Sequence, residues 1–325
     1  MKAIFGETYG APEKVLQLKE VEKPVPAEGQ LLLKVHAASV NISDYYVLTG
    51  LSRLFGSGLL RPKDPSVGTD VAGQVEAVGP DVVLFHAGDE VFGSGQGSFA
   101  EYTLASETRV ALKPANVSFE EAAAVPIAGL TALQCLRDKG NVKAGQEVAV
   151  NGASGGVGTF AVQIAKCFGA HVTGICSTRN VDQARSLGAD RVVDYTKEDF
   201  TREGRTYDMI CDIAGNRSVS DYKRALKPGG IFVSVGFSGN PLVGLVRLTV
   251  LGKLGSMTGD KTFKLMGIAK MNAEDMGFMA ELLAAGKVKP VIEKVCQLSE
   301  AAQALQYIGR KHTRGKVVIS VPSAD

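Results

Sequence analysis

A strand, a glycine-rich turn and a helix follow one another without a gap near the middle of the chain. The apolar run Glu147–Asn151 is typical of a buried strand, the turn Gly152–Gly158 reads Gly-Ala-Ser-Gly-Gly-Val-Gly, and a helix is predicted from about Gly156 to Phe168. Glycines without a Cβ let the backbone approach a pyrophosphate, and the start of the helix offers free N–H groups to it. The spacing differs from GxGxxG, but a strand before the turn and a helix after it favour dinucleotide binding over a purely structural turn.

Strands and helices continue to alternate after this turn. A helix is predicted near Val181–Leu187, closed by Gly188, and the turn signal Lys227–Gly230 precedes the last strand. Strands separated by helix-length segments predict a parallel, doubly wound sheet with right-handed crossovers. The predicted strands are His171–Cys176, Tyr207–Ile213 and Ile231–Val235.

The two ends of the chain have a different texture. The first part is β-rich, with short apolar segments bounded by Gly, Pro or Asp at Gln30–Ala37, Gly73–Val78 and Glu90–Phe92. Because 325 residues exceed what one core usually serves, two domains are expected. Periodicity alone does not decide whether the tail extends the middle sheet or returns to the first domain. The tail is predicted to contain a helix at Ala273–Ala285, a strand at Val291–Val295, a helix at Ser299–Ile308 and a strand at Lys316–Ser320.

The residues after His171–Cys176 bear on the identity of the dinucleotide. An NAD enzyme usually places Asp or Glu about 20 residues past the glycines, where it binds the ribose 2′-hydroxyl. Here Cys176 is followed by Ser-Thr-Arg-Asn, and the first carboxylate is Asp182. Arg179 offers a cation suited to a phosphate, so the sequence predicts NADPH rather than NADH. The alternative is that Arg179 is a solvated loop charge.

Zinc ligands are missing where a zinc-dependent dehydrogenase needs them. Residues 1–134 contain no cysteine, and their only histidines are His36 and His86, each of which is interpreted as structural or surface. No GxSxG motif occurs, so the chemistry must depend on hydride from the cofactor. A quinone or enone suits such a site, because the charge that hydride attack produces spreads onto an oxygen that hydrogen-bond donors can stabilise.

Composition excludes several other classes of protein. The net charge of +2 arises from 36 basic and 34 acidic residues without a basic block, so no nucleic-acid partner is expected. Five scattered cysteines fit a reducing compartment, and the charged N-terminus contains no signal peptide, which together predict a cytoplasmic location. The apolar stretch 242–254 is too short and too interrupted to span a membrane. It is interpreted as a substrate-pocket or dimer contact in preference to a membrane-surface segment.

Several motifs before the glycine turn occur in a characteristic order. They are Val40–Tyr46, Val67–Gly73, Gly88–Phe92, Gly97–Tyr102 and Ala124–Ala132. Together they resemble the zinc-independent medium-chain dehydrogenase/reductases, in the quinone oxidoreductase or zeta-crystallin-like branch. The runs Ser177–Asn180, Ser186–Asp190 and Val193–Tyr195 are especially similar to the chloroplast-envelope quinone oxidoreductase homologues.

The resemblance implies an α/β protein with a GroES-like β-rich substrate domain at 1–120, completed by 265–325, and a Rossmann NADPH-binding domain at 121–264. It implies a homodimer, an active cleft between the domains, and no metal, since Gly68-Thr69-Asp70 stands where zinc-dependent relatives have Gly-His-Glu. The implied cofactor contacts are Asn41, Thr131, Ser154, Gly155, Gly156, Val157, Ser177, Arg179, Asn180, Tyr195, Asp212, Ile213, Gly236, Phe237 and Lys316.

The resemblance also assigns roles to individual residues. Asn41 and Tyr46 are the expected catalytic pair beside the nicotinamide, where Tyr46 donates to the substrate oxygen or relays a proton; its alternative is a packing aromatic. Asp44 and Asp70 are interpreted as structural hydrogen-bond acceptors at turns. The predicted function is NADPH-dependent reduction of quinones or α,β-unsaturated carbonyls. A zinc-free alcohol dehydrogenase and a non-catalytic NADPH-binding sensor or structural protein are the alternatives, and the sequence does not name the substrate.

Overall fold

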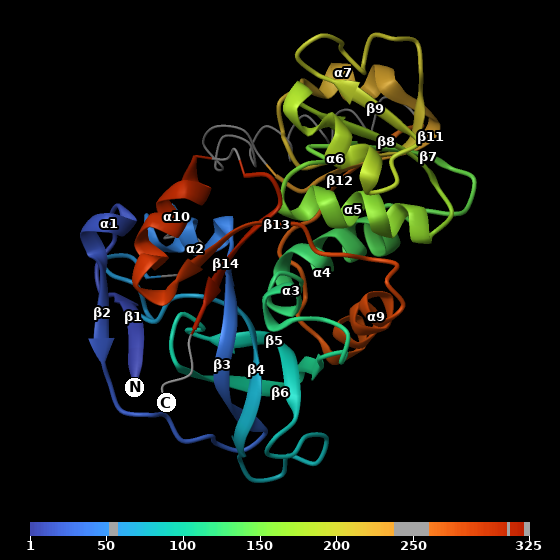
Figure 1. Ribbon diagram of the computed structural model, residues 1–325. Helices are drawn as coiled ribbons and strands as arrows, with labels where there is room; N and C mark the ends of the chain where they lie inside the picture. Colours follow the sequence, from blue (N-terminus) through green and yellow to red (C-terminus); the bar gives the residue numbers. More distant parts are fainter. Residues whose placement is uncertain (52–57, 237–259, 311–312, 322–325) are drawn as a thin grey trace. The chain divides into compact units, whose positions relative to one another are not determined.

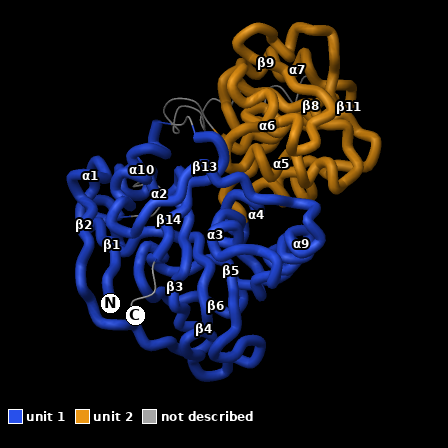
Figure 2. The backbone as a smooth tube through the Cα atoms, in the orientation of Figure 1, with its two compact units in different colours: residues 1–130, 270–325 blue, residues 131–269 orange. Residues whose placement is uncertain are grey.

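The computed structural model describes residues 1–51, 58–236, 260–310 and 313–321. The chain divides into two compact units, which Figure 2 colours separately. Unit 1 comprises Met1–Leu130 and Lys270–Asp325, and unit 2 comprises Thr131–Ala269. The apolar stretch 242–254 lies outside the described residues.

Unit 2 is built on a six-stranded sheet in the order β12-β11-β10-β7-β8-β9. Neighbouring strands run parallel throughout, and the order is that of a doubly wound dinucleotide-binding sheet. The prediction of a parallel Rossmann-type sheet is therefore confirmed. The strands are β7 (Glu147–Asn151), β8 (His171–Cys176), β9 (Arg191–Asp194), β10 (Tyr207–Asp212), β11 (Leu226–Ser234) and β12 (Thr262–Leu265).

Helices connect these strands (Figure 1). Aromatic side chains belong to the hydrophobic core of the unit. Phe200, Tyr222 and Phe232 are buried, and the rings of Tyr222 and Phe232 lie 4.4 Å apart between centroids. Each ring that is buried in this way stabilises the unit by a few kcal/mol, about 25 cal/mol for each Å² removed from water. The helices and turns are η2 (Cys135–Lys139, a π-helical turn), α5 (Gly156–Cys167), η3 (Thr178–Asn180), α6 (Val181–Ser186) and α7 (Val219–Ala225).

The turn predicted at Lys227–Gly230 lies inside β11 instead of before it. Tyr207 pairs with Leu226, but Met209 already pairs with Ile231, so the intervening residues form an irregularity in the strand. Gly229 has a φ of 74°, which glycine adopts without strain. The turn signal was thus correct, and the strand begins earlier than predicted.

Unit 1 contains a second six-stranded sheet, in the order β13-β14-β3-β4-β5-β6. An additional pairing of β3 with β6 closes four of these strands into a ring, and β1 (Lys2–Gly6) pairs separately with β2 (Leu16–Glu20). The β-rich character predicted for the first part is confirmed. The strands of the sheet are β3 (Gln30–Val40), β4 (Asp70–Val78), β5 (Glu90–Gln96), β6 (Tyr102–Leu112), β13 (Ile292–Gln297) and β14 (Lys316–Ser320).

The tail of the chain returns to unit 1, which settles the question that periodicity left open. β14 pairs antiparallel with β3 and parallel with β13. Val317 and Ile319 of β14 share one buried cluster with Leu31 and Leu33 of β3, so apolar burial fixes the last strand in place. The helices of this unit are α1 (Pro12–Val15), α2 (Ile42–Leu48), α3 (Phe119–Ala123), the first part of α4 (Pro126–Gln134), α9 (Ala273–Ala284), η4 (Leu298–Glu300) and α10 (Ala301–Gly309).

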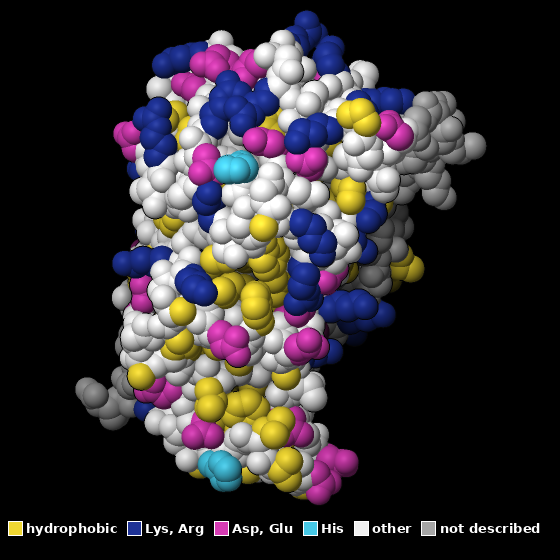
Figure 3. Space-filling view, turned by 90° about the vertical axis from the view of Figure 1, so that its right-hand side faces the viewer, with side chains coloured by type: hydrophobic (Ala, Val, Ile, Leu, Met, Phe, Trp, Pro, Cys, Tyr) yellow, Lys and Arg dark blue, Asp and Glu magenta, His cyan; other side chains and the backbone are white. Residues whose placement is uncertain are grey.

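The surface carries mixed charge. On the face drawn in Figure 3, basic and acidic side chains are interspersed, in keeping with a net charge of +2. Among the described residues, no helix combines the length and the apolar character that crossing a membrane would need.

Candidate functional site

The glycine turn of unit 2 has the geometry of a phosphate cradle. Gly152 follows β7 with a φ of 97°, and Gly155 caps α5 with extended backbone. A Cβ on Gly158 would lie 2.0 Å from the carbonyl oxygen of Gly152, so only glycine fits there. A Cβ on Gly155 would meet only that same oxygen, at 3.8 Å, among the described residues. Among the described residues, the space in front of Gly155 is therefore open to a ligand.

Three of the predicted cofactor residues come together beside this turn. The Nδ2 of Asn180 donates to Ser154 Oγ at 3.0 Å and to Ser177 Oγ at 3.1 Å. Asn180 is 4% exposed, and its Oδ1 is buried without a hydrogen-bond partner among the described residues. Buried acceptors are nearly always paired, so this oxygen is suited to a donor from a bound molecule. The ribose hydroxyls of a dinucleotide are donors of that kind, and the residues fit the cofactor.

The residues predicted for the 2′-phosphate lie along the same sheet edge. Ser177 is the half-buried N-cap of η3, and Arg179 is exposed within η3. Tyr195 is 44% exposed, and its backbone N–H donates to the Cys176 carbonyl at 3.0 Å. The parallel pairing of β8 with β9 thus brings Tyr195 next to the strand end from which Ser177 and Arg179 follow.

A carboxylate that sequence reasoning missed lies at this edge. Asp194 pairs with Cys176 across β8 and β9, and it accepts hydrogen bonds from Thr178 Oγ1 at 2.6 Å and Thr196 Oγ1 at 2.7 Å. The hydrogen bond from Thr178 is the main cause that lowers the pKa of Asp194 to about 2. Asp194 is distant in sequence from the end of β8 and reaches this edge through strand register, which spacing along the chain does not show.

Asp212 occupies the neighbouring edge, at the end of β10, but its side chain is committed to the protein. Its Oδ1 accepts from Asn151 Nδ2 at 2.8 Å and from the Gly215 N–H at 3.0 Å, and burial raises its pKa to about 6. The backbone N–H of Gly236 donates to the Asp212 carbonyl at 3.2 Å, and that of Ile213 donates to the Asn151 carbonyl at 2.9 Å. Asp212, Ile213 and Gly236 therefore share one edge of the sheet.

The predicted cofactor set has two further members, Thr131 and Phe237. Thr131 lies in α4 and is 8% exposed. Phe237 lies outside the described residues.

Unit 1 holds a buried polar network that joins Asn41 to Lys316. Lys316 Nζ donates to Asn41 Oδ1 at 2.6 Å, and Asn41 Nδ2 donates to Asp70 Oδ2 at 2.9 Å. Lys316 and Asp70 form an ion pair at 3.4 Å, and their side chains are 3% and 0% exposed. Asp70 also accepts from Ser39 Oγ at 2.7 Å and from the Ile127 N–H at 3.0 Å. The sequence predicted Asn41 and Lys316 separately and missed Asp70 as their link.

Both aspartates accept hydrogen bonds as predicted, but neither lies at a turn, since Asp44 lies in α2 and Asp70 in β4. Asp44 accepts the backbone N–H of Asn41 at 2.8 Å and thereby caps α2. Asp70 accepts hydrogen bonds too, but it lies in β4 and not at a turn. Burial is the main cause that raises the pKa of Asp44 to about 7.

The remaining side chains of interest in unit 1 are aromatic or imidazole groups. Tyr46 is half-buried in α2, and its ring lies 6.3 Å from that of Tyr45. His36 stacks on Phe119 at 4.2 Å, and the His86 side chain is 84% exposed, so each histidine is structural or surface as predicted. Across the described ranges, no cluster of three or more His, Cys, Asp or Glu residues is placed to share a metal ion.

Comparison with known proteins places this arrangement in a family. Residues 27–115 match the alcohol dehydrogenase GroES-like domain, and residues 187–319 match the zinc-binding dehydrogenase family. Over 333 residues, 98% of each chain, the sequence is 35% identical to a chloroplast envelope quinone oxidoreductase homolog of Arabidopsis thaliana. The chain belongs to the medium-chain dehydrogenase/reductases, in their quinone oxidoreductase branch. The resemblance seen in the motifs is thereby confirmed.

Solved structures agree with this assignment. The quinone oxidoreductase from Coxiella burnetii is 32% identical, with 99% of each chain covered and a TM-score of 0.85. The Escherichia coli quinone oxidoreductase complexed with NADPH is 27% identical, with 98% of this chain and 100% of that chain covered and a TM-score of 0.84. The GroES-like and Rossmann folds predicted for the two parts of the chain are both confirmed.

Proposed function

We propose that this protein is an NADPH-dependent, zinc-free reductase that transfers hydride to quinones or α,β-unsaturated carbonyl compounds. One observation carries the proposal: the glycine cradle at Gly155 lies beside Ser154, Ser177 and Asn180. Counting described residues alone, the cradle is open and Asn180 Oδ1 has no hydrogen-bond partner. The Escherichia coli quinone oxidoreductase, whose fold this chain shares, was crystallised with NADPH. That relative supports the choice of cofactor.

The residues of unit 2 would bind the cofactor, which supplies the hydride when bound. Ser154 and the backbone amides at the start of α5 hold the pyrophosphate, assisted by the positive end of the helix dipole. Ser177, Arg179 and Tyr195 hold the 2′-phosphate, and Thr131 orients the carboxamide. The neighbouring contacts come from Gly156, Val157, Asn180, Asp212, Ile213, Gly236 and Phe237.

The residues of unit 1 would serve the substrate. Lys316 holds the Asn41 amide in one orientation beside the nicotinamide, because the 2.6 Å hydrogen bond and burial leave that side chain little freedom. Tyr46 donates a hydrogen bond to the substrate oxygen. Such donors stabilise the charge that hydride transfer places on a conjugated oxygen, which is the task of zinc in zinc-dependent relatives. Thr69, in place of a histidine, agrees with a site that uses no zinc.

The test is turnover with purified protein. Loss of the reduced-nicotinamide absorbance is followed with benzoquinones, 2-alkenals and cyclic enones, and simple alcohols are offered with NADP⁺. We expect NADPH oxidation with the quinones or the conjugated carbonyls. Oxidation of alcohols instead would support a zinc-free alcohol dehydrogenase, and tight NADPH binding without any turnover would support a non-catalytic sensor.

Replacing Arg179 by alanine should raise the KM for NADPH about 10-fold to 100-fold, since a hydrogen-bonded charge pair contributes about 1.5–3 kcal/mol. The KM for NADH should stay the same, because NADH has no 2′-phosphate. Arg185→Ala is the matched control, since that side chain is 65% exposed on α6 and pairs with Asp182 at 3.5 Å. Equal losses with both cofactors would contradict the assignment of Arg179.

We also propose a cytoplasmic homodimer. None of the five cysteines, all of which lie in described parts of the chain, forms a disulfide, which fits a reducing compartment. Light scattering on the purified protein measures the oligomeric state, and a monomer at micromolar concentration would refute the dimer.

A further inference from the structure

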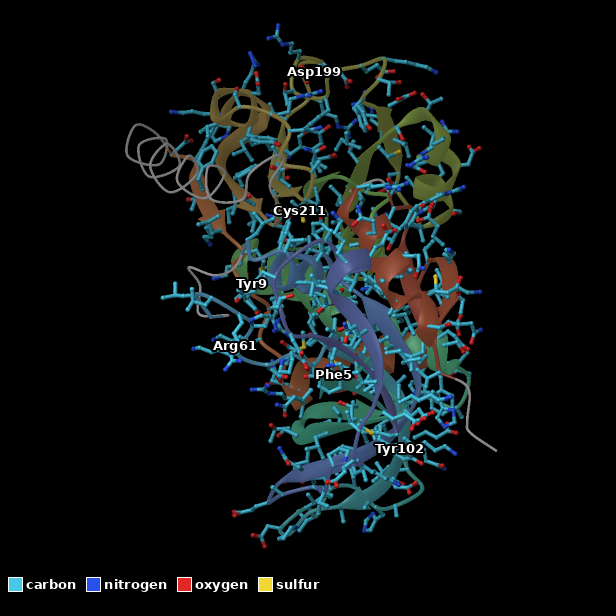
Figure 4. The ribbon with its side chains drawn as sticks, turned by 90° about the vertical axis from the view of Figure 1, so that its left-hand side faces the viewer. Phe5, Tyr9, Arg61, Tyr102, Asp199 and Cys211 are labelled. Carbon is cyan, nitrogen blue, oxygen red and sulfur yellow. The ribbon has the colours of Figure 1, made fainter. Side chains whose placement is uncertain are left out.

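Unit 1 contains a cavity of about 250 Å³ that reaches the buried side chain of Asp44. Asp44 and Thr69 line it, together with Gly6 and Pro62. Figure 4 labels Phe5, which precedes Gly6 in the chain, and Arg61, which precedes Pro62. Tyr46 is not among the described residues that line the cavity.

Asp44 contacts the hydroxyl group of Thr69, which also lines the cavity. Its Oδ2 is held by the backbone N–H of Asn41 at 2.8 Å, while its Oδ1 lies 3.3 Å from Thr69 Oγ1. Asp44 is 8% exposed, whereas Thr69 is half-buried, so Thr69 is the more accessible of the two. A threonine hydroxyl can accept one proton and donate another, which a proton relay requires.

No cation in the described part of the chain forms an ion pair with Asp44. The charged groups that act on it are Asp70 on β4 and Lys316 on β14, and Asp64 lines the same cavity. The Lys316 ammonium is directed at Asn41 and Asp70, which also accepts from Ser39. Two buried carboxyl groups thus share one lysine, and burial with repulsion from Asp70 raises the pKa of Asp44 to about 7. Asp44 therefore exchanges a proton near neutral pH.

We propose that Asp44, acting through the Thr69 hydroxyl, supplies the proton that completes reduction of a substrate whose oxygen enters this cavity. The inference rests on the proposed reductase function and adds the source of its proton. Once hydride has reached the substrate carbon, the Thr69 O–H bond breaks and its proton joins the substrate oxygen. The Asp44 carboxyl O–H bond breaks as Thr69 regains a proton. Asp44 is left as a carboxylate and is reprotonated from solvent water.

The relay divides the work between two side chains. Thr69 touches the substrate, and Asp44 acts through it as the proton store. The relay needs no contact from Tyr46, which does not line the cavity within the described residues.

The experiment compares Asp44→Asn, Thr69→Val and Thr69→Ser with the wild type, using NADPH and a 2-alkenal between about pH 5 and pH 9, a range that brackets the ordinary titration of a perturbed carboxyl. Wild-type kcat/KM should be constant at low pH and fall as pH rises through the pKa of Asp44, because the relay needs the protonated acid. Asp44→Asn and Thr69→Val should lower kcat about 100-fold, the usual contribution of a positioned acid, and should abolish that pH dependence. Thr69→Ser should retain the wild-type kcat and its pH dependence, because serine keeps the hydroxyl group.

Controls distinguish loss of the proton relay from loss of folding and from failure of the proposed reductase function. Asp81→Asn changes an exposed carboxylate of the same unit and should leave the profile intact. Thermal melts and NADPH titrations show whether each variant is folded and binds cofactor, and if Asp44→Asn does not fold, the Thr69 pair decides the outcome. An unchanged pH profile in active Thr69→Val would overturn the relay and leave the reductase function standing. A wild type without turnover on any quinone or enone would overturn both.

Discussion

Replacing Lys316 by methionine is expected to lower the free energy of unfolding by about 3–5 kcal/mol, the usual result of leaving a buried carboxylate without its partner. Asp70 is fully buried, and Lys316 is the cation that the structure pairs with it, at 3.4 Å. Methionine keeps most of the volume of the lysine stem, so the loss reports the charge and not a cavity. Urea denaturation followed by circular dichroism measures it.

The double variant Lys316→Met/Asp70→Asn should recover at least half of that loss, because it removes the unpaired charge as well. Lys14→Met, at an exposed position of α1, is the control for losing a lysine and should change stability by less than about 0.5 kcal/mol. If Lys316→Met were as stable as the wild type, the ion pair would not be what holds Asp70 in the core.

Replacing Gly158 by alanine is the second large effect that we expect. The new Cβ would lie 2.0 Å from the Gly152 carbonyl oxygen and 2.9 Å from backbone atoms of Ala153, so α5 must move away from the turn. Such overpacking costs about 1–3 kcal/mol and sometimes more. NADPH affinity, measured by fluorescence titration, should fall at least 10-fold because the cradle loses its shape, and a melting curve should show the loss of stability.

Gly155→Ala separates the effect on NADPH affinity from the effect on stability. At this position the Cβ would meet only the Gly152 oxygen at 3.8 Å, within the described residues, so stability should be nearly unchanged. NADPH affinity should still fall, because the methyl group occupies the space through which the pyrophosphate approaches. Gly277→Ala in α9, where a Cβ has open space, controls for helix propensity and should be slightly stabilising. Unimpaired NADPH binding by Gly155→Ala would place the cofactor elsewhere.

Much of unit 2 could be predicted from the sequence because its strands are buried on both faces. The bounds of β7 and β8 were predicted to the residue, since each is a continuous apolar run between turn signals. β6 in unit 1 was not predicted, because the polar stretch Ser106–Arg109 interrupts its apolar pattern. β11 begins earlier than predicted because strand pairing continues across a turn signal.

The candidate site also has a part that could be predicted from the sequence and a part that could not. The glycine cradle is local in sequence, so its residues could be found by their spacing. The contact between Lys316 and Asp70 joins residues 246 positions apart, and it depends on β14 pairing with β3 and on β3 pairing with β4. Strand register of this kind leaves no trace in spacing, which is why Asp70 and Asp194 were missed.

The position of β14 between β13 and β3 also sets an order of events during synthesis. Unit 2 is one uninterrupted segment, 131–269, and all of its strands are available once that segment has left the ribosome. Unit 1 must wait for residues 316–320 before β3 gains β14 as a further neighbour and Asp70 gains a cation. The first-made part of this chain is therefore the last to be finished, and until then its sheet has an open edge that chaperones or a neighbouring chain can reach.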